Sequence, residues 1–145
     1  MSLPTEPIGS IPRPEELIES LRAYRDGDLS QEARDQVSDR ALRATIDAFE
    51  DTGSPVITDG EQAKPSFLTY PIEGAPNLEP GGVEIPFEAG HTRQLPRLTE
   101  GPFRYETYAV EYLEQAQAHA SVPVKQSVIS ASEKRSSTRL LRSTN

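Results

Sequence analysis

The chain has 145 residues with no cysteine, 26% charged residues and a formal net charge of −8, and this length predicts a single domain. The acidic balance argues against nucleic acid as a partner, and the lack of cysteine excludes disulfides and zinc sites with thiolate ligands within these residues. No apolar run approaches the roughly 20 residues that span a bilayer, and residues 1–10 lack the pattern of a signal peptide, so we expect a soluble, cytoplasmic protein without membrane contacts.

The first third of the sequence predicts a short strand and two helices. Residues 7–12 (PIGSIP) predict a strand followed by a loop, because proline is excluded from helix interiors. Residues 14–16 (PEE) suit a helix start, and Gly27 suits its left-handed end. Ser30 is a suitable N-cap for a second, longer helix that ends at Gly53. The apolar stripe of this helix is Ala33, Val37, Ala41, Ala44 and Ala48, with Leu42, Ile46 and Phe49 beside it.

A strand and a long irregular segment follow. Residues 54–58 form a β-branched run, and the long helical connection before it favours parallel strands in an α/β fold. Residues 64–104 are rich in proline and glycine, so regular helix is not expected there. Within this excursion, the fragments 83–87 and 93–95 predict a small hairpin, and loops of this length commonly cover or bind ligands.

The last part of the sequence predicts one helix, one strand and a tail. Apolar residues and tyrosines at three- and four-residue spacing predict a helix over residues 105–116, and residues 123–130 predict a third strand. Residues 132–145 turn basic in an otherwise acidic chain, which indicates a loosely attached tail. We expect three adjacent parallel strands, near residues 6–10, 55–59 and 123–129.

Two predicted strand ends carry residues that suit ligand binding. In α/β proteins ligands collect beyond the carboxyl ends of parallel strands, where we expect Ser10 to meet the Asp59-Gly60-Glu61 turn. Glu61 can hold an ammonium group, while the Ser10 hydroxyl and the backbone around Gly9 can hold a carboxylate. Together they describe an amino-acid head-group site. The residues alone also allow the alternative that these side chains only cap local turns.

Other candidate residues point less clearly to chemistry. His91, near two arginines, suits an anionic ligand or a solvated loop, and His119 suits the end of the third helix. Lys125 lies in the third strand and points either into a barrel mouth or to solvent. No His pair or carboxylate cluster has metal-ligand spacing, so no metal site is expected in this chain. Three tyrosines suit either a stacking platform or helix packing, and they are Tyr105, Tyr108 and Tyr112.

Three segments resemble, in order and spacing, the start of the catalytic, C-terminal-type domain of cobalamin-independent methionine synthase. They are residues 7–14 (PIGSIPRP), 57–62 (ITDGEQ) and 123–125 (PVK). Residues 64–67 (KPSF) and 90–96 (GHTRQLP) look like the stand-alone methionine-synthase-like proteins rather than the two-domain enzyme. The resemblance covers residues 5–131.

The resemblance implies part of a (β/α)8 barrel in which homocysteine receives a methyl group from a polyglutamylated methyltetrahydrofolate. The family's Ile-Gly-Ser element and the glutamate of its Gly-Glu element hold the amino-acid part of homocysteine. This implies substrate binding by Ile8, Gly9, Ser10 and Glu61. The residue before the Gly-Glu pair is His in the two-domain enzymes and Asp59 here, which bears on acceptor specificity. The family's zinc is held by His, Cys and Glu on later strands, so zinc is not expected to bind this chain.

A (β/α)8 barrel needs ~250 residues, whereas this sequence supplies about the first three strands and their helices. We therefore expect residues 1–131 to be the N-terminal part of a methionine-synthase-like barrel domain, followed by the divergent tail. The expected function is that of a fragment of a homocysteine S-methyltransferase-like protein in methionine biosynthesis. The alternative is a non-catalytic binding or interaction module, or a truncated product without activity. Self-association through the exposed edge of the third strand is a further expectation.

Overall fold

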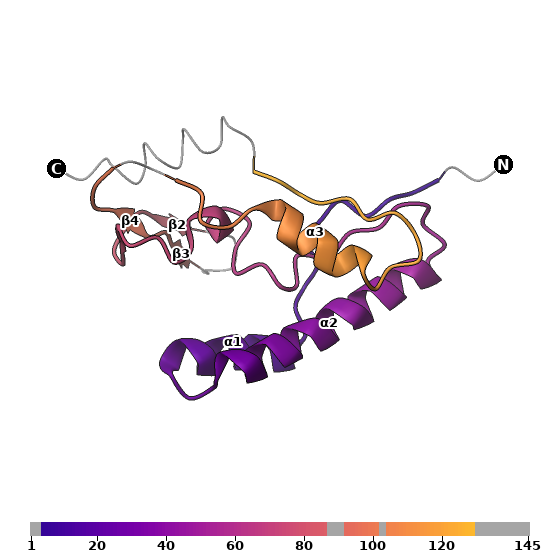
Figure 1. Cartoon of the computed structure of the whole chain (residues 1–145), viewed down its shortest axis with the longest axis horizontal. Coiled ribbons are helices and arrows are strands. Elements are labelled where there is room, and N and C mark those ends of the chain that lie inside the picture. The colour runs from indigo at the N-terminus through magenta and orange to yellow at the C-terminus, as the bar shows by residue number, and fades with distance from the viewer. Residues whose placement is uncertain (1–3, 87–91, 102–103, 130–145) are drawn as a thin grey trace. The chain divides into compact units, whose positions relative to one another are not determined.

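A computed structural model describes residues 4–86, 92–101 and 104–129 of the chain (Figure 1). It is a mixed α/β structure that divides into two compact units. The first unit is Met1–Lys64 with Ala109–Ser127, and the second is Pro65–Tyr108 with Val128–Asn145. The residues of the candidate site all belong to the first unit, so that unit carries most of the functional argument.

The two helices predicted at the start of the first unit are confirmed. Helix α1 spans Glu15–Asp26, and Gly27 ends it with a φ of 86°, a left-handed conformation that glycine adopts without steric cost. Helix α2 spans Gln31–Asp51, and the Ser30 side chain accepts a hydrogen bond from the Ala33 amide as its N-cap. The two helices pack against each other (Figure 1).

The buried side of α2 differs from the predicted stripe. The residues of α2 that are buried are Ala41, Leu42, Thr45 and Ile46, whereas Ala44 and Ala48 are exposed. The larger side chains decide which side faces inward, because burying leucine and isoleucine removes more apolar surface from water than burying alanine. The core of the unit consists of Leu42, Ile46, Ile57 and Ala116, with Phe49, Ala120, Val122 and Val124 packed against it.

The three predicted strands are extended segments rather than regular strands, and this corrects the prediction. Ile57 and Val124 form an isolated parallel bridge, in which the Ile57 amide donates to Pro123 and the Lys125 amide donates to Ile57. Residues 5–11 run parallel to residues 54–60, since hydrogen bonds join Ser54 to Thr5, Thr58 to Gly9 and Ile11 to Gly60. The middle segment therefore contacts both others, as predicted, but with too few backbone pairs for a ladder.

The third helix is shorter than predicted. Helix α3 spans Ala109–Gln117, so Tyr105 and Tyr108 precede it and do not share its face. Their rings contact each other edge to face with centroids 5.5 Å apart, and the Glu106 amide donates to the Pro71 carbonyl. These contacts within the second unit engage the residues before Ala109, so the helix does not extend back to Tyr105.

The predicted hairpin is confirmed in the second unit. Strand β2 (Glu84–Pro86) pairs antiparallel with β3 (Thr92–Gln94), and Ile85 lies opposite Arg93. A second antiparallel pair, β1 (Leu78–Glu79) with β4 (Arg97–Leu98), and a short 3-10 helix, η1 (Tyr70–Ile72), were not predicted. The described residues of the proline-rich segment thus contain more regular structure than the composition indicated.

Several predictions fall on other parts of the chain. His91 and the tail at 132–145 lie outside the described residues. Self-association through the third segment stays a prediction. Within residues 4–86, 92–101 and 104–129, none of the helices has the length and apolar character needed to cross a membrane.

Candidate functional site

A tight turn follows the middle extended segment, and its own polar groups hold it. Asp59 accepts a hydrogen bond from the Glu61 amide through its side chain (3.0 Å) and from the Gln62 amide through its carbonyl (3.3 Å). The Gly60 amide donates to the Thr58 hydroxyl at 3.2 Å. Glu61 has a φ of 57°, a left-handed conformation that is costly for a residue with a side chain. Such strain concentrates at functional sites, where surrounding contacts maintain it.

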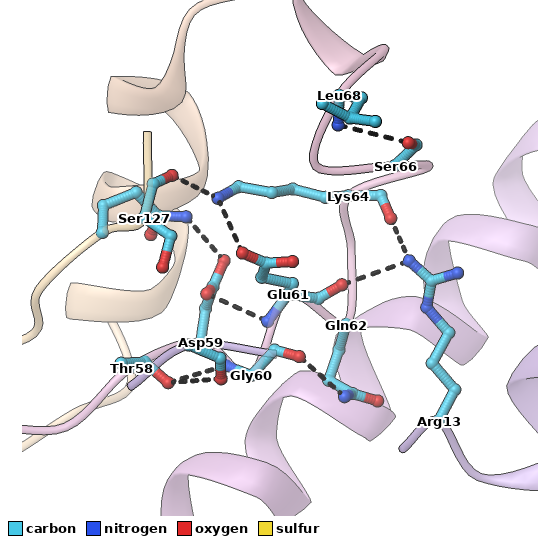
Figure 2. Close-up of polar contacts among 12 residues, drawn as sticks. Arg13, Thr58, Asp59, Gly60, Glu61, Gln62, Lys64, Ser66, Leu68 and Ser127 are labelled. Atoms are coloured by element: carbon cyan, nitrogen blue, oxygen red, sulfur yellow. Dashed lines mark hydrogen bonds and ion pairs between the residues drawn. The ribbon is translucent and has the colours of Figure 1, made fainter. Parts of the chain in front are cut away.

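Distant parts of the first unit hold this turn in place (Figure 2). The Thr58 hydroxyl donates to the Gly9 carbonyl, and the Ile11 amide donates to the Gly60 carbonyl at 3.2 Å. The Arg13 guanidinium donates to the backbone carbonyls of both Glu61 and Lys64. The turn is therefore fixed to the N-terminal segment by bonds across roughly fifty residues of sequence.

Three charged side chains gather at the turn (Figure 2). The Lys64 side chain is 0% exposed, and its Nζ lies 4.0 Å from Glu61 Oε1 and donates to the Ser127 carbonyl at 2.8 Å. Asp59 is 2% exposed, and its second carboxylate oxygen accepts from the Gln126 side chain at 2.9 Å. Two carboxylates and one ammonium thus share a space that is nearly closed to water.

Burial changes the proton affinity of all three groups. Desolvation raises the pKa of Asp59 and of Glu61 above the ordinary values, because the charged forms lose water. Desolvation also lowers the pKa of Lys64, although the charges of Asp59 and Glu61 oppose that change. The positive charge of Lys64 counters part of the rise at each carboxyl group. Lys64 therefore acts on the pKa of both carboxyl groups, and both carboxylates act on the pKa of Lys64.

The structure brings together two of the four predicted substrate-binding residues. Gly9 is buried, and a Cβ at Gly9 would lie 3.6 Å from Glu61 Oε1 and 2.6 Å from the Ser127 hydroxyl. A side chain at this position would therefore have to displace the Ser127 hydroxyl. Ile8 is 94% exposed and Ser10 is exposed as well. The roles of all four residues in binding stay predictions, as does the expected closeness of Ser10 to Glu61.

Sequence reasoning missed Lys64 as a member of the site. Its position three residues after Glu61 could have indicated an ion pair, since a short turn can bring the side chains of residues 61 and 64 together. Ser127 was missed for a different reason, because its carbonyl binds Lys64 over 63 residues of sequence and no local pattern shows this. Two other candidates have different contacts: Lys125 forms an exposed ion pair with Glu6 at 2.8 Å, and His119 contacts Asp39 of α2 at 3.2 Å.

Zinc does not fit the site that these residues form. In the described part of the chain, no three His, Cys, Asp or Glu side chains cluster closely enough to hold a metal ion. Both oxygens of Asp59 accept hydrogen bonds, from Glu61 and Gln126, and the Glu61 carboxylate faces the Lys64 ammonium. A divalent cation would have to displace these donors, which are already paired with the carboxylates.

The arrangement suits recognition of a positively charged group. Asp59 and Glu61 face the ammonium of Lys64, with the Arg13 guanidinium nearby, and the Glu61 carboxylate is the anionic group that can pair with a further cation. A nearly dry site strengthens such an ion pair when its groups are also hydrogen-bonded. An ammonium group of a small ligand matches this charge and size.

Comparisons with known proteins agree on one relationship, although no family model matches the sequence. The chain is 34% identical over 68 residues to a methionine synthase of Sulfolobus acidocaldarius, covering 47% of this chain and 20% of that protein. It is 27% identical over 128 residues to a 5-methyltetrahydropteroyltriglutamate–homocysteine methyltransferase of Saccharophagus degradans, covering 86% of this chain and 16% of that protein.

A solved structure shows a similar fold. The B12-independent methionine synthase from Shewanella sp. W3-18-1, in complex with selenomethionine, superposes with a TM-score of 0.62 at 20% identity. The likeness covers 84% of this chain and 36% of that one. The chain spans about a fifth of the length of the curated relatives it matches. The resemblance to the cobalamin-independent methionine synthases is therefore confirmed over part of the chain.

Proposed function

We propose, from this relationship to the methionine synthases, that the chain supplies the amino-acid-binding part of a homocysteine S-methyltransferase. The methyl acceptor is homocysteine and the donor is a methyltetrahydrofolate, as the resemblance implies. The chain's part in the reaction is to hold the head group of homocysteine or methionine. No methyl-transfer step is assigned to its residues.

One observation carries this proposal, which is the closeness of Gly9 to the Glu61 carboxylate. Glu61 binds the ammonium group of the amino acid, and the backbone around Gly9 with the Ser10 hydroxyl binds its carboxylate. Ile8 completes the set as an apolar side chain available to the rest of the ligand. The buried carboxylate gives the ammonium group a charged partner that water screens only weakly.

The proposal includes a partial barrel. The segments at 5–11, 54–60 and 123–127 are its first three strands, and α1, α2 and α3 are helices of its outer layer. Their parallel direction and the central place of the middle segment support this topology. In this proposal residues 1–131 are the N-terminal part of the barrel domain, with 64–104 as a long excursion.

The proposal is tested by amide chemical-shift mapping of the full chain with L-methionine and L-homocysteine at concentrations up to several millimolar. Shift changes are expected at Gly9, Ser10 and Glu61, and N-acetyl-L-methionine, which lacks the ammonium group, is expected to cause none of them. The Glu61→Gln variant is expected to lose the response.

The matched control is Glu79→Gln, which neutralises an exposed glutamate of the second unit that pairs with Arg97. This variant is expected to bind as the unmodified chain does. Equal binding of L-methionine and its N-acetyl form, or an unchanged response of Glu61→Gln, contradicts the proposal.

A further inference from the structure

Lys64 is fully buried, and the proposed contacts with the amino acid do not include it. An ammonium group removed from water is costly unless other groups compensate its charge. The described contacts of Lys64 supply that compensation within the first unit. They also connect the turn at residues 58–64 with the segment that contains Ser127.

The Lys64 ammonium joins three elements. It donates to the carbonyl of Ser127, it lies 4.0 Å from Glu61 Oε1, and it lies 5.8 Å from the ring centre of Tyr112 on α3. Figure 2 shows the lysine side chain extended across the site, with its Nζ between the Ser127 carbonyl and the Glu61 carboxylate. The backbone carbonyl of Lys64 is in turn bound by Arg13. Both ends of this residue are therefore held.

We propose that Lys64 is a positioning residue, whose ammonium ties the Asp59–Glu61 turn to the segment ending at Ser127 and places a positive charge 4.0 Å from Oε1 of the Glu61 carboxylate, which binds an ammonium-bearing ligand. The ligand part of this statement rests on the proposed function. The effect of Lys64 on Glu61 does not, since it follows from the geometry of the chain alone.

The charges that face Glu61 give the direction of the effect. Burial raises the pKa of Glu61 most strongly, and the nearby Asp59 carboxylate raises it further. Lys64 opposes this rise most, followed by Arg13 and the hydrogen bond from the Ser127 hydroxyl. Arg13 is already engaged with the backbone carbonyls of residues 61 and 64. Without the lysine charge, the two carboxylates would face each other with less compensation, and Glu61 would hold a proton to higher pH.

The first experiment follows the Glu61 carboxyl carbon by 13C NMR during a pH titration of the full chain. In Lys64→Met, which removes the charge at similar length, the Glu61 transition is expected to move to higher pH. Adding Asp59→Asn in that background is expected to move it back, because the repelling charge is gone. A purely structural role of Lys64 predicts no such rescue.

The matched control is Lys125→Met, the same substitution at an exposed lysine on the segment that carries Ser127. It is expected to leave the Glu61 transition unchanged. If Lys64→Met does not fold, Lys64→Gln serves instead, because its amide retains a donor for the Ser127 carbonyl. A Glu61 transition at the same pH with and without the Lys64 charge overturns the proposal.

The second experiment measures L-methionine binding by the same variants across pH. Lys64→Met is expected to bind roughly tenfold or more weakly at a pH below the Glu61 transition that the 13C titration finds in that variant, with part of the loss recovered above that transition as Glu61 ionises. A uniform loss at every pH contradicts the electrostatic part of the proposal. If the unmodified chain binds no methionine, the proposed function is wrong, and the 13C titration still decides the role of Lys64.

Discussion

The turn at residues 58–64 and the hairpin of β2 and β3 are both short polar segments, but different bonds hold them. The hairpin is a local structure, in which the paired residues are at most ten positions apart in sequence. The turn depends on side chains and carbonyls between 48 and 67 residues away in sequence. A change in the turn therefore disturbs the whole first unit, whereas a change in the hairpin stays local. Four substitution experiments test this difference.

The largest effect is expected from alanine at Gly60. Its φ is 59°, and an added Cβ would lie 2.8 Å from the Thr45 methyl group and 2.9 Å from Ile11 Cγ1. Backbone strain and overpacking together are expected to lower the free energy of unfolding by about 3 kcal/mol. Gly81 in the second unit also has a positive φ but has open space around it. Gly81→Ala is expected to cost about 1 kcal/mol, and urea unfolding of both variants measures the difference.

A smaller effect on stability is expected from alanine at Gly9. The added Cβ would meet the Ser127 hydroxyl at 2.6 Å, and that hydroxyl can rotate away, so the cost is about 1 kcal/mol. Moving the hydroxyl removes a hydrogen bond that lowers the pKa of Glu61. Weaker methionine binding is therefore expected in chemical-shift titrations. Gly101→Ala, with open space around it, is the control, and equal binding losses in the two variants would contradict the close approach.

The pH dependence of stability is a third test. Burial raises the pKa of Glu61 above its value of 4.5 in the unfolded chain. At a pH between the pKa of the unfolded chain and that of the folded chain, the folded chain therefore binds more protons at Glu61 than the unfolded chain does. Stability is therefore lost through Glu61 as pH rises across that window. Glu61→Gln is expected to gain stability relative to the unmodified chain over the same pH range, as measured by urea unfolding at stepped pH. If the difference in free energy of unfolding between the two proteins does not change with pH, burial does not perturb the pKa of this carboxyl group.

The smallest effect is expected in the second unit, at the exposed ion pair between Glu79 and Arg97 across β1 and β4. Solvent screens this pair, so Glu79→Gln is expected to change the free energy of unfolding by less than about 1 kcal/mol. The change should shrink further in high salt. A loss as large as that of Gly60→Ala would remove the contrast between the two regions.

Local patterns in the sequence predicted the local structures of the molecule. The α1 stop at Gly27, the Ser30 cap and the β2–β3 hairpin each depend on neighbouring residues, and each was predicted correctly. The start of α3 was wrong because tyrosines at helical spacing precede the helix without joining it. The three predicted strands are extended segments and not regular strands, since few backbone hydrogen bonds join them.

The candidate site, like the fold, could be predicted only where it depends on local sequence. The closeness of Gly9 and Glu61 could be expected because each lies at the end of a recognisable extended segment, and their role in binding, which the family resemblance implies, stays a prediction. Lys64 was missed because its burial depends on Ser127, Tyr112 and Arg13, which come from distant segments. A lysine in sequence is expected on the surface, and only the folded arrangement shows why this one is not.

The isolated bridge between Ile57 and Val124 has a consequence for the order of folding. Helices α1 and α2 are neighbours in sequence and can pair early, whereas the bridge must close a loop of more than sixty residues. The contacts of Lys64 with Ser127 and of Asp59 with Gln126 close loops of the same length. We therefore expect the binding site to form in the last step of folding, so that ligand binding reports the completed fold and not a partly folded state.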